Sequence, residues 1–193
     1  MLMEDSLIYF PTSYPTGNWN TTGRGPCPIE DVYFKADDGV KTHGWFLKHP
    51  QSDKILVYYH GNAGSIADRY EWGCQLRDAG ASVLMVEYRG YGRSGGKPGE
   101  EGFYRDAEAV WSWLTGTKGY TAKTIILYGK SLGGGVAVGL VAGLEAADQR
   151  IEGTSDLASA GGLLDSPWGR LAKQRRFPHE LALALRQGPL QGV

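Results

Sequence analysis

The sequence has 193 residues, with 20 Lys and Arg against 21 Asp and Glu and a net charge of −1. This balance excludes the strongly basic surface that is typical of nucleic-acid-binding proteins. A chain of this length buries enough surface to fold as one domain without disulfide bonds. It contains no apolar run of the roughly 18 residues that a membrane span needs, and the first ten residues lack a basic segment like that of a signal peptide. We therefore expect a cytoplasmic protein with no nucleic-acid partner and no membrane span.

The cysteines do not indicate a disulfide framework. Cys27 and Cys74 are only two and lack C-x-x-C spacing, so we expect both to be reduced, with Cys74 inside a helix. Glycine, by contrast, is abundant: its 29 residues are about twice the usual share of roughly 7%. Without a collagen-like repeat, this abundance indicates tight backbone turns.

Composition divides the chain into three parts. Residues 1–30 are rich in Pro, Gly, Thr and Asn and predict an irregular N-terminal arm. Residues 31–147 carry the regular hydrophobic patterns of a domain core. Residues 148–193 form a C-terminal tail of different composition, in which Leu, Ala, Arg, Gly and Pro dominate.

The strand patterns begin directly after the arm. Residues 32–35 and 42–48 alternate apolar and polar side chains around Asp37-Asp38-Gly39, which predicts a hairpin. Three short, nearly continuous apolar runs then predict strands that are buried on both faces; they are residues 55–59, 82–86 and 125–128.

Helical patterns fill the gaps between these strands, at residues 65–79, 101–114 and 132–147. The last is small and apolar, so we expect a helix that is buried on most sides and whose glycines admit a close neighbour. The alternation of strands and helices predicts an α/β fold, with a mostly parallel sheet and helices on both faces. In such sheets the chemistry lies beyond the carboxyl ends of the strands.

The first segment that carries chemistry is Gly129-Lys130-Ser131-Leu132-Gly133. It is a G-x-S-x-G sequence between a predicted strand and a predicted helix, and its glycines permit a sharp turn that exposes the serine hydroxyl. The N-terminus of the following helix supplies free N–H groups and a positive dipole where an oxyanion would form. Ser131 is therefore the candidate nucleophile.

The second segment is His60-Gly61-Asn62-Ala63-Gly64, directly after the first buried strand. A loop at this place can direct a backbone N–H at the space above Ser131, as the second oxyanion donor beside the N–H of Leu132. His60 precedes the serine in the chain and begins the loop. We expect His60 to have a structural role, with its ring hydrogen-bonded to the loop backbone.

The third segment is YRGYGRSGG, residues 88–96, and with HGNAG and GKSLGGG it carries a family resemblance. In order and spacing the three resemble the α/β-hydrolase superfamily, in its branch of serine esterases, lipases and thioesterase-like enzymes, over roughly residues 30–142. The resemblance implies that Ser131 is the nucleophile and that Leu132 and Asn62 are the oxyanion donors. It also implies an acyl ester or thioester substrate, no cofactor, and a supporting structural loop containing Arg89, Tyr91 and Arg93.

Two competing motifs fail on their context. Gly90, Gly92 and Gly95 match the dinucleotide-binding pattern G-x-G-x-x-G, but the loop continues through residues 96–99 instead of opening a helix. Gly129-Lys130-Ser131 resembles the end of a phosphate-binding loop, but a strand precedes it.

We predict no metal site. His43 and His49 lie on the predicted hairpin without a carboxylate cluster and are expected to be surface or packing residues.

The C-terminal tail departs from the family pattern, in which an acid and then a histidine follow the serine. Its residues 151–193 contain only two β-branched aliphatic residues, Ile151 and Val193, which predicts no buried strand there. Short helices are expected at residues 171–176 and 179–186. We therefore expect a C-terminally truncated or frameshifted hydrolase that lacks its C-terminal strands.

Two interpretations of this tail remain open. Asp165 and His179 follow Ser131 in the order that a triad requires, although neither follows a predicted strand. The alternative is a non-catalytic fragment whose strand at residues 125–128 forms an exposed sheet edge. Such an edge would favour self-association.

Overall fold

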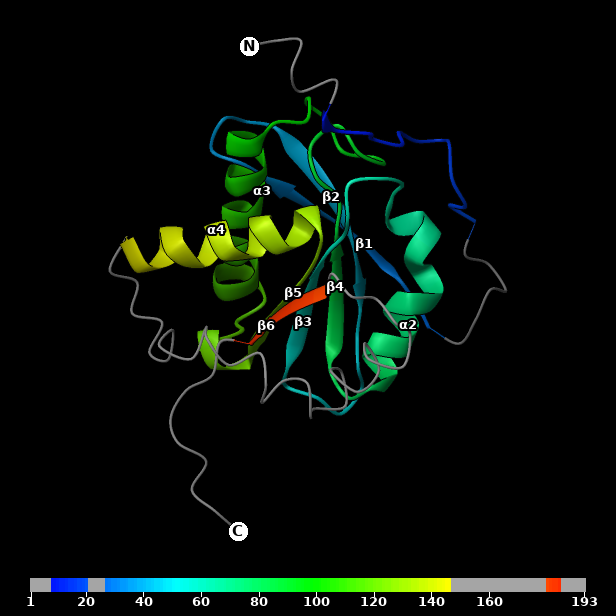
Figure 1. Cartoon of the computed structure of the whole chain (residues 1–193). Helices are drawn as coiled ribbons and strands as arrows, with labels where there is room; N and C mark the ends of the chain where they lie inside the picture. Colours follow the sequence, from blue (N-terminus) through cyan, green and yellow to red (C-terminus); the bar gives the residue numbers. More distant parts are fainter. Residues whose placement is uncertain (1–7, 21–26, 147–179, 185–193) are drawn as a thin grey trace.

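The structure is a computed structural model that describes residues 8–20, 27–146 and 180–184. It contains a twisted sheet flanked by helices (Figure 1). The strands are β1 (Glu30–Lys35), β2 (Lys41–Leu47), β3 (Ile55–Tyr59), β4 (Ser82–Val86), β5 (Ile125–Lys130) and β6 (Glu180–Ala184). β1 and β2 form the expected hairpin, and Gly39 in its turn has the positive φ of 85° that glycine adopts without strain.

The helical segments also follow the predicted order. They are the 3-10 helix η1 (Ile66–Arg69), α2 (Tyr70–Asp78), α3 (Glu100–Ser112), the π-helical turn η2 (Trp113–Thr117), the 3-10 turn η3 (Ala122–Thr124) and α4 (Leu132–Ala146). The two predicted helices at residues 65–79 and 101–114 therefore each divide into an α-helix and a shorter helical turn. Cys74 lies in α2, and both cysteines are free and buried.

The predicted α/β fold is confirmed, and its sheet is mixed in strand direction. Its strand order is β1-β2-β4-β3-β5-β6. The central strands β4, β3 and β5 are parallel to one another, whereas β2 pairs antiparallel with both β1 and β4. The β1–β2 pair is antiparallel because the short turn between these strands permits no parallel pairing.

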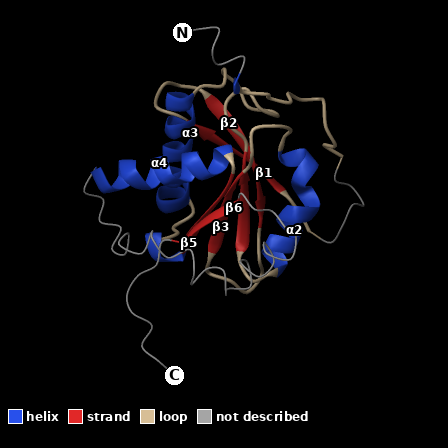
Figure 2. Ribbon diagram, in the orientation of Figure 1, coloured by secondary structure: helices blue, strands red, loops and turns tan. Residues whose placement is uncertain are grey.

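Helices cover both faces of the sheet, as predicted (Figure 2). On one face α3 and α4 pack on Val57, Tyr59 and Leu127. On the other face α2 packs on Leu56 and Tyr58. Alternate residues of β3 thus pack into the hydrophobic cores on the two faces of the sheet. This explains why all five residues of the strand are buried and continuously apolar.

A strand in the C-terminal tail corrects an expectation from the sequence. Residues 180–184 form β6, antiparallel to β5, with Leu183 opposite Leu127 and Leu181 opposite Gly129. The prediction of a helix over residues 179–186 is therefore wrong at these positions, as is that of an uncovered edge at residues 125–128. The physical reason is that an edge strand satisfies its backbone N–H and C=O groups by pairing, which needs no β-branched side chain. Residues 171–176 lie outside the described part of the chain.

α4 is buried on one side only. Val136, Ala137, Leu140 and Val141 face the core, while Val138 is 45% exposed. The expectation of burial on most sides is therefore wrong for the outer face of α4. Its glycines do admit close neighbours, as expected: a Cβ on Gly139 would lie 2.2 Å from the Tyr104 ring of α3.

Candidate active site

The turn between β5 and α4 places Ser131 in an unusual backbone conformation. Its φ is 51°, and among the described residues it is the one non-glycine residue with a positive φ. Such a conformation is sterically strained for a residue with a Cβ and is typical of the nucleophile turn of α/β hydrolases. The side chain of Ser131 is exposed.

Both flanking glycines are required by close backbone contacts. A Cβ on Gly129 would lie 2.2 Å from the carbonyl oxygen of Gly133, and a Cβ on Gly133 would lie 2.1 Å from the carbonyl oxygen of Tyr59. The turn is therefore tight, and it presses the start of α4 against the end of β3. This contact explains why the motif needs glycine at both positions.

The start of α4 provides the electrostatic environment beside Ser131. Leu132 is the first residue of this 15-residue helix, and the first N–H groups of a helix have no partner within the helix. The helix dipole adds positive potential at the same end. This arrangement favours an anion close to the serine.

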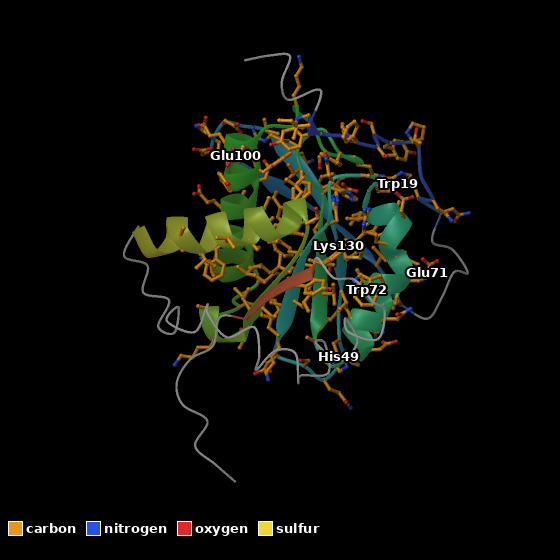
Figure 3. All side chains as sticks on the ribbon, in the orientation of Figure 1. Trp19, His49, Glu71, Trp72, Glu100 and Lys130 are labelled. Atoms are coloured by element: carbon orange, nitrogen blue, oxygen red, sulfur yellow. The ribbon has the colours of Figure 1, made fainter. Side chains whose placement is uncertain are left out.

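The HGNAG loop lies against this turn. A Cβ on Gly61 would lie 3.5 Å from the carbonyl oxygen of Lys130 and 3.7 Å from Cβ of Ser131. The parallel pairing of β3 with β5 causes this proximity, because Tyr59 lies opposite Gly129 and both strands end at the same edge. Figure 3 marks Lys130, the last residue of β5.

A buried pair of side chains, His60 and Glu87, supports the HGNAG loop. Both side chains are completely buried, and His60 Nε2 lies 3.2 Å from Glu87 Oε2. The other carboxylate oxygen, Oε1, accepts a hydrogen bond of 2.6 Å from the N–H of Ile66. Tyr88 donates its hydroxyl proton to the His60 carbonyl oxygen, also over 2.6 Å. The loop is thus held at its beginning and at its end.

The His60 ring also fixes the orientation of one peptide group. Its Nδ1 lies 2.7 Å from the carbonyl oxygen of Gly61, and since a carbonyl only accepts, Nδ1 is the donor. The Gly61–Asn62 peptide is trans, so its C=O and N–H point in opposite directions. The N–H of Asn62 therefore points away from the His60 ring. The expected hydrogen bond from the His60 ring to the loop backbone is confirmed.

Arg69 fixes one further carbonyl group of the loop and that of the residue directly after it. Its two terminal nitrogens donate to the carbonyl oxygens of Ser65 and Ala63, each over 2.5 Å. The carboxylate of Asp68 accepts the backbone N–H of Ser65 at 2.9 Å. Several backbone groups of the loop and of Ser65 are thus held by hydrogen bonds, as a preorganised group of N–H donors requires.

The loop after β4 has a structural role, as the resemblance implies for Arg89. The guanidinium of Arg89 bridges the buried Asp106 of α3, at 2.8 Å, and Asp38 of the hairpin turn, at 2.7 Å. Hydrogen bonds from Arg89 lower the pKa of Asp38. The network therefore joins three separate segments around the carboxyl end of the sheet.

A pocket of about 200 Å³ opens beside Ser131. Its walls come from the N-terminal arm, α3 and α4, and its lining residues include Tyr9, Glu100, Phe103, Tyr104, Leu132 and Val136. Glu100 lies at the beginning of α3 (Figure 3) and accepts a 2.9 Å hydrogen bond from the Tyr104 hydroxyl. The Glu100 carboxylate raises the pKa of Tyr104 through this hydrogen bond. The pocket thus combines apolar walls with one acidic edge.

No histidine of the described residues hydrogen-bonds to Ser131. His43 is buried and bonds to Asp31 at 2.6 Å, and His60 has both ring nitrogens engaged. His49 is partly exposed at the end of the hairpin and accepts a hydrogen bond from the N–H of Gln51. The other candidates, Asp165 and His179, lie outside the described part of the chain.

The structure also tests the competing motifs. Gly90, Gly92 and Gly95 lie in a loop whose first helical residue is Glu100, so they do not open a helix. Residues 125–130 form β5, so Gly129-Lys130-Ser131 does not end a phosphate-binding loop. Within the described residues no cluster of His, Cys, Asp and Glu has a composition suited to a metal ion. None of the helices described is both long and apolar enough to span a bilayer.

Several site residues were missed by the sequence patterns. Glu87 follows β4 directly, at the carboxyl end of the sheet, so its place was a signal that could have identified it. Phe103 lies in the predicted helix of residues 101–114, but the helical pattern gave no indication of its place in the pocket. Tyr9 lies in an arm without periodicity and gave no signal.

Comparison with known proteins supports the same fold. Residues 50–174 match the Hydrolase_4 family, described as serine aminopeptidase, S33. The esterase Pf2001 of Pyrococcus furiosus has a similar structure, with a TM-score of 0.55 and 30% identity over 67% of this chain and 51% of the esterase. An alpha-beta hydrolase from Vibrio vulnificus gives a TM-score of 0.56 and 29% identity over 63% of this chain and 42% of that protein.

Sequence relatives match a similar share of the chain. The uncharacterised protein Rv2307c of Mycobacterium tuberculosis is 37% identical over 139 residues, which are 69% of this chain and 47% of the relative. The α/β-hydrolase domain-containing protein WAV2 of Arabidopsis thaliana is 34% identical over 69% of this chain and 45% of its own length. The chain thus spans about half the length of the curated relatives it matches. Its strained serine turn, its sheet and these matches agree, and the chain belongs to the Hydrolase_4 family of the α/β-hydrolase superfamily.

Proposed function

We propose that this α/β hydrolase cleaves acyl esters or thioesters with Ser131 as the nucleophile and the N–H groups of Leu132 and Asn62 as the oxyanion hole. The observation that carries the proposal is the positive φ of Ser131 at the junction of β5 and α4. The HGNAG loop packed against the same turn supports it, as does the likeness to the Pyrococcus furiosus esterase.

The proposed reaction has two steps. Ser131 Oγ attacks the acyl carbonyl carbon while a general base takes the hydroxyl proton, and the carbonyl oxygen becomes an oxyanion that accepts from the two N–H groups. The bond to the leaving alcohol or thiol then breaks, and the leaving group takes the proton from the base. Water, activated by the same base, hydrolyses the acyl-serine and releases the carboxylic acid.

The base in this proposal comes from outside the described residues. The described histidines make other hydrogen bonds. His179 follows Ser131 in the chain, and Asp165 lies between them. This is the chain order of nucleophile, acid and base in the superfamily.

A fluorophosphonate probe tests the proposal, because it labels only an activated serine. The complete chain is expected to form a covalent phosphonyl adduct on Ser131, located by mass spectrometry of the digested protein. Ser131→Ala should abolish the adduct, whereas Ser112→Ala, which changes an exposed serine of α3, should retain it. Labelling that survives in Ser131→Ala, or a folded wild-type chain that is not labelled, would contradict the proposal.

If Ser131 is labelled, one further variant identifies the base. His179→Ala should then reduce the labelling rate by orders of magnitude, because a serine without its base is a weak nucleophile at neutral pH. His49→Ala is the matched control, since His49 lies on the hairpin and not at the serine. Equal labelling rates in the two variants would exclude His179 as the base.

A further inference from the structure

The pocket beside Ser131 is partly built by the N-terminal arm. Tyr9 is the arm residue that lines it. Its ring meets the ring of Phe103 edge-on, with centroids 5.0 Å apart and an interplanar angle of 81°. Edge-on pairs of this geometry are favourable beyond the area that they bury. Tyr9 therefore forms one packed wall of the pocket, against a helix almost a hundred residues away in the sequence.

The side chain of Asn62 holds the arm on both sides of Tyr9. Its Oδ1 accepts the N–H of Phe10 at 3.1 Å, and its Nδ2 donates to the carbonyl oxygen of Ile8 at 2.6 Å. The hydroxyl of Tyr91 donates to the same Oδ1 at 2.9 Å. The amide group is thus used as both donor and acceptor. Because both neighbours of Tyr9 are bonded to one side chain, the position of its ring is set by the HGNAG loop.

Further contacts extend this attachment along the arm. Pro11 forms a bridge with Gly64 of the HGNAG loop. The N–H of Gly92 donates to the carbonyl oxygen of Thr12, and the N–H of Tyr14 donates to the carbonyl oxygen of Gly92. The arm therefore follows the carboxyl end of the sheet, across the loops that surround Ser131.

We infer that the arm is part of the substrate site and that Tyr9 limits the acyl group to a short chain. This inference rests on the proposed function. The pocket of about 200 Å³ is smaller than the roughly 300–1,000 Å³ of pockets that hold drug-sized ligands. Tyr9 and Phe103 both line this pocket and pack on each other, so we expect the Tyr9 ring to occupy space that a longer acyl chain would need.

Acyl chain length provides the test. We expect the complete wild-type chain to hydrolyse p-nitrophenyl butanoate with a much higher kcat/KM than p-nitrophenyl octanoate. Tyr9→Ala should shift this ratio toward the octanoate by at least about tenfold, since one methylene group in an apolar pocket changes specificity roughly 10- to 200-fold. Tyr9→Phe keeps the ring and should keep the wild-type ratio.

The matched control is Tyr14→Ala, because Tyr14 lies on the same arm and is 53% exposed. It should leave the ratio unchanged, so a general loosening of the arm would be distinguished from removal of the pocket wall. An unchanged ratio in Tyr9→Ala would overturn the inference while leaving the proposed function intact.

A second measurement separates the two proposals when no ester is turned over. Absence of turnover and of fluorophosphonate labelling contradicts the proposed function. Binding of the product carboxylates, followed by calorimetry, then still tests the pocket: octanoate should bind Tyr9→Ala more tightly than the wild type, and butanoate should not. Equal octanoate affinity in both chains would overturn the inference.

Discussion

His60 shows how much one residue can do without touching a substrate. Its ring donates a hydrogen bond to the carbonyl oxygen of Gly61. This bond fixes the orientation of the Gly61–Asn62 peptide and therefore the direction of the Asn62 N–H. The other nitrogen of the His60 ring meets the buried Glu87. A histidine in this position is a positioning residue, and it is distinct from the general base that the reaction needs.

Replacing this pair should therefore slow the chemistry more than it weakens binding. In His60→Gln and Glu87→Gln we expect the maximal rate of fluorophosphonate labelling to fall by roughly 10- to 10³-fold, approaching the loss of one oxyanion donor. The probe concentration at half-maximal rate should change little. Labelling kinetics at several probe concentrations separate the two quantities.

The control for this pair is His49→Gln, which alters a partly exposed histidine two residues after β2. A fall in thermal stability without a fall in the maximal labelling rate would show that His60 and Glu87 serve the fold alone.

At the scale of elements, the junction of β5 and α4 depends on close backbone contact. Gly133 lies so near the end of β3 that a Cβ would be 2.1 Å from the Tyr59 carbonyl oxygen. A backbone oxygen within a sheet cannot move aside without disturbing the strand. The sharp turn at Ser131 and the packing of α4 on the sheet are therefore one structural feature.

Two glycines of the same helix should consequently respond in opposite directions to alanine. Gly133→Ala is expected to lower the free energy of unfolding by about 1–3 kcal/mol or more through overpacking. Gly135→Ala is expected to raise it by about 1 kcal/mol, the helix preference of alanine over glycine, because nothing lies within 4 Å of its added Cβ. Urea denaturation measures both. Equal effects would contradict the close contact.

At the scale of the whole molecule, β6 covers the edge of β5 and itself becomes the terminal strand of the sheet. It pairs with β5 from Ile126 to Lys130. An apolar strand such as β5 would otherwise offer unpaired backbone groups to other chains. Because β6 pairs antiparallel with β5, we expect less self-association through β5 than the sequence alone suggested.

Prolines in β6 test this role in the complete chain. Ala182→Pro with Leu183→Pro removes two successive N–H donors from the strand, and we expect more dimer and aggregate in size-exclusion chromatography with light scattering. The matched double variant Ala182→Val with Leu183→Val keeps the N–H groups and should behave like the wild type. The same monomer fraction in all three chains would show that β6 does not protect the edge.

The amino-acid sequence by itself determined the strands that are buried on both faces and the position of Ser131. Residues 55–59 are continuously apolar because both faces of β3 are covered. The burial of the strand can therefore be predicted from its residue types alone. The glycines around Ser131 likewise follow from a local requirement, a turn too tight for a Cβ. Local patterns of this kind do not depend on what the rest of the chain does.

Only the tertiary structure decided which distant segments meet at the serine. Tyr9 lines the pocket because Asn62 holds the arm, and Glu87 supports the HGNAG loop because β3 and β4 are neighbours. β6 forms because β5 offers an edge, although its own residues have weak strand preferences. These contacts are made largely by backbone groups of residues that lie tens of positions apart in the sequence. Neither the hydrophobic periodicity nor the motif spacing predicts which of these segments meet.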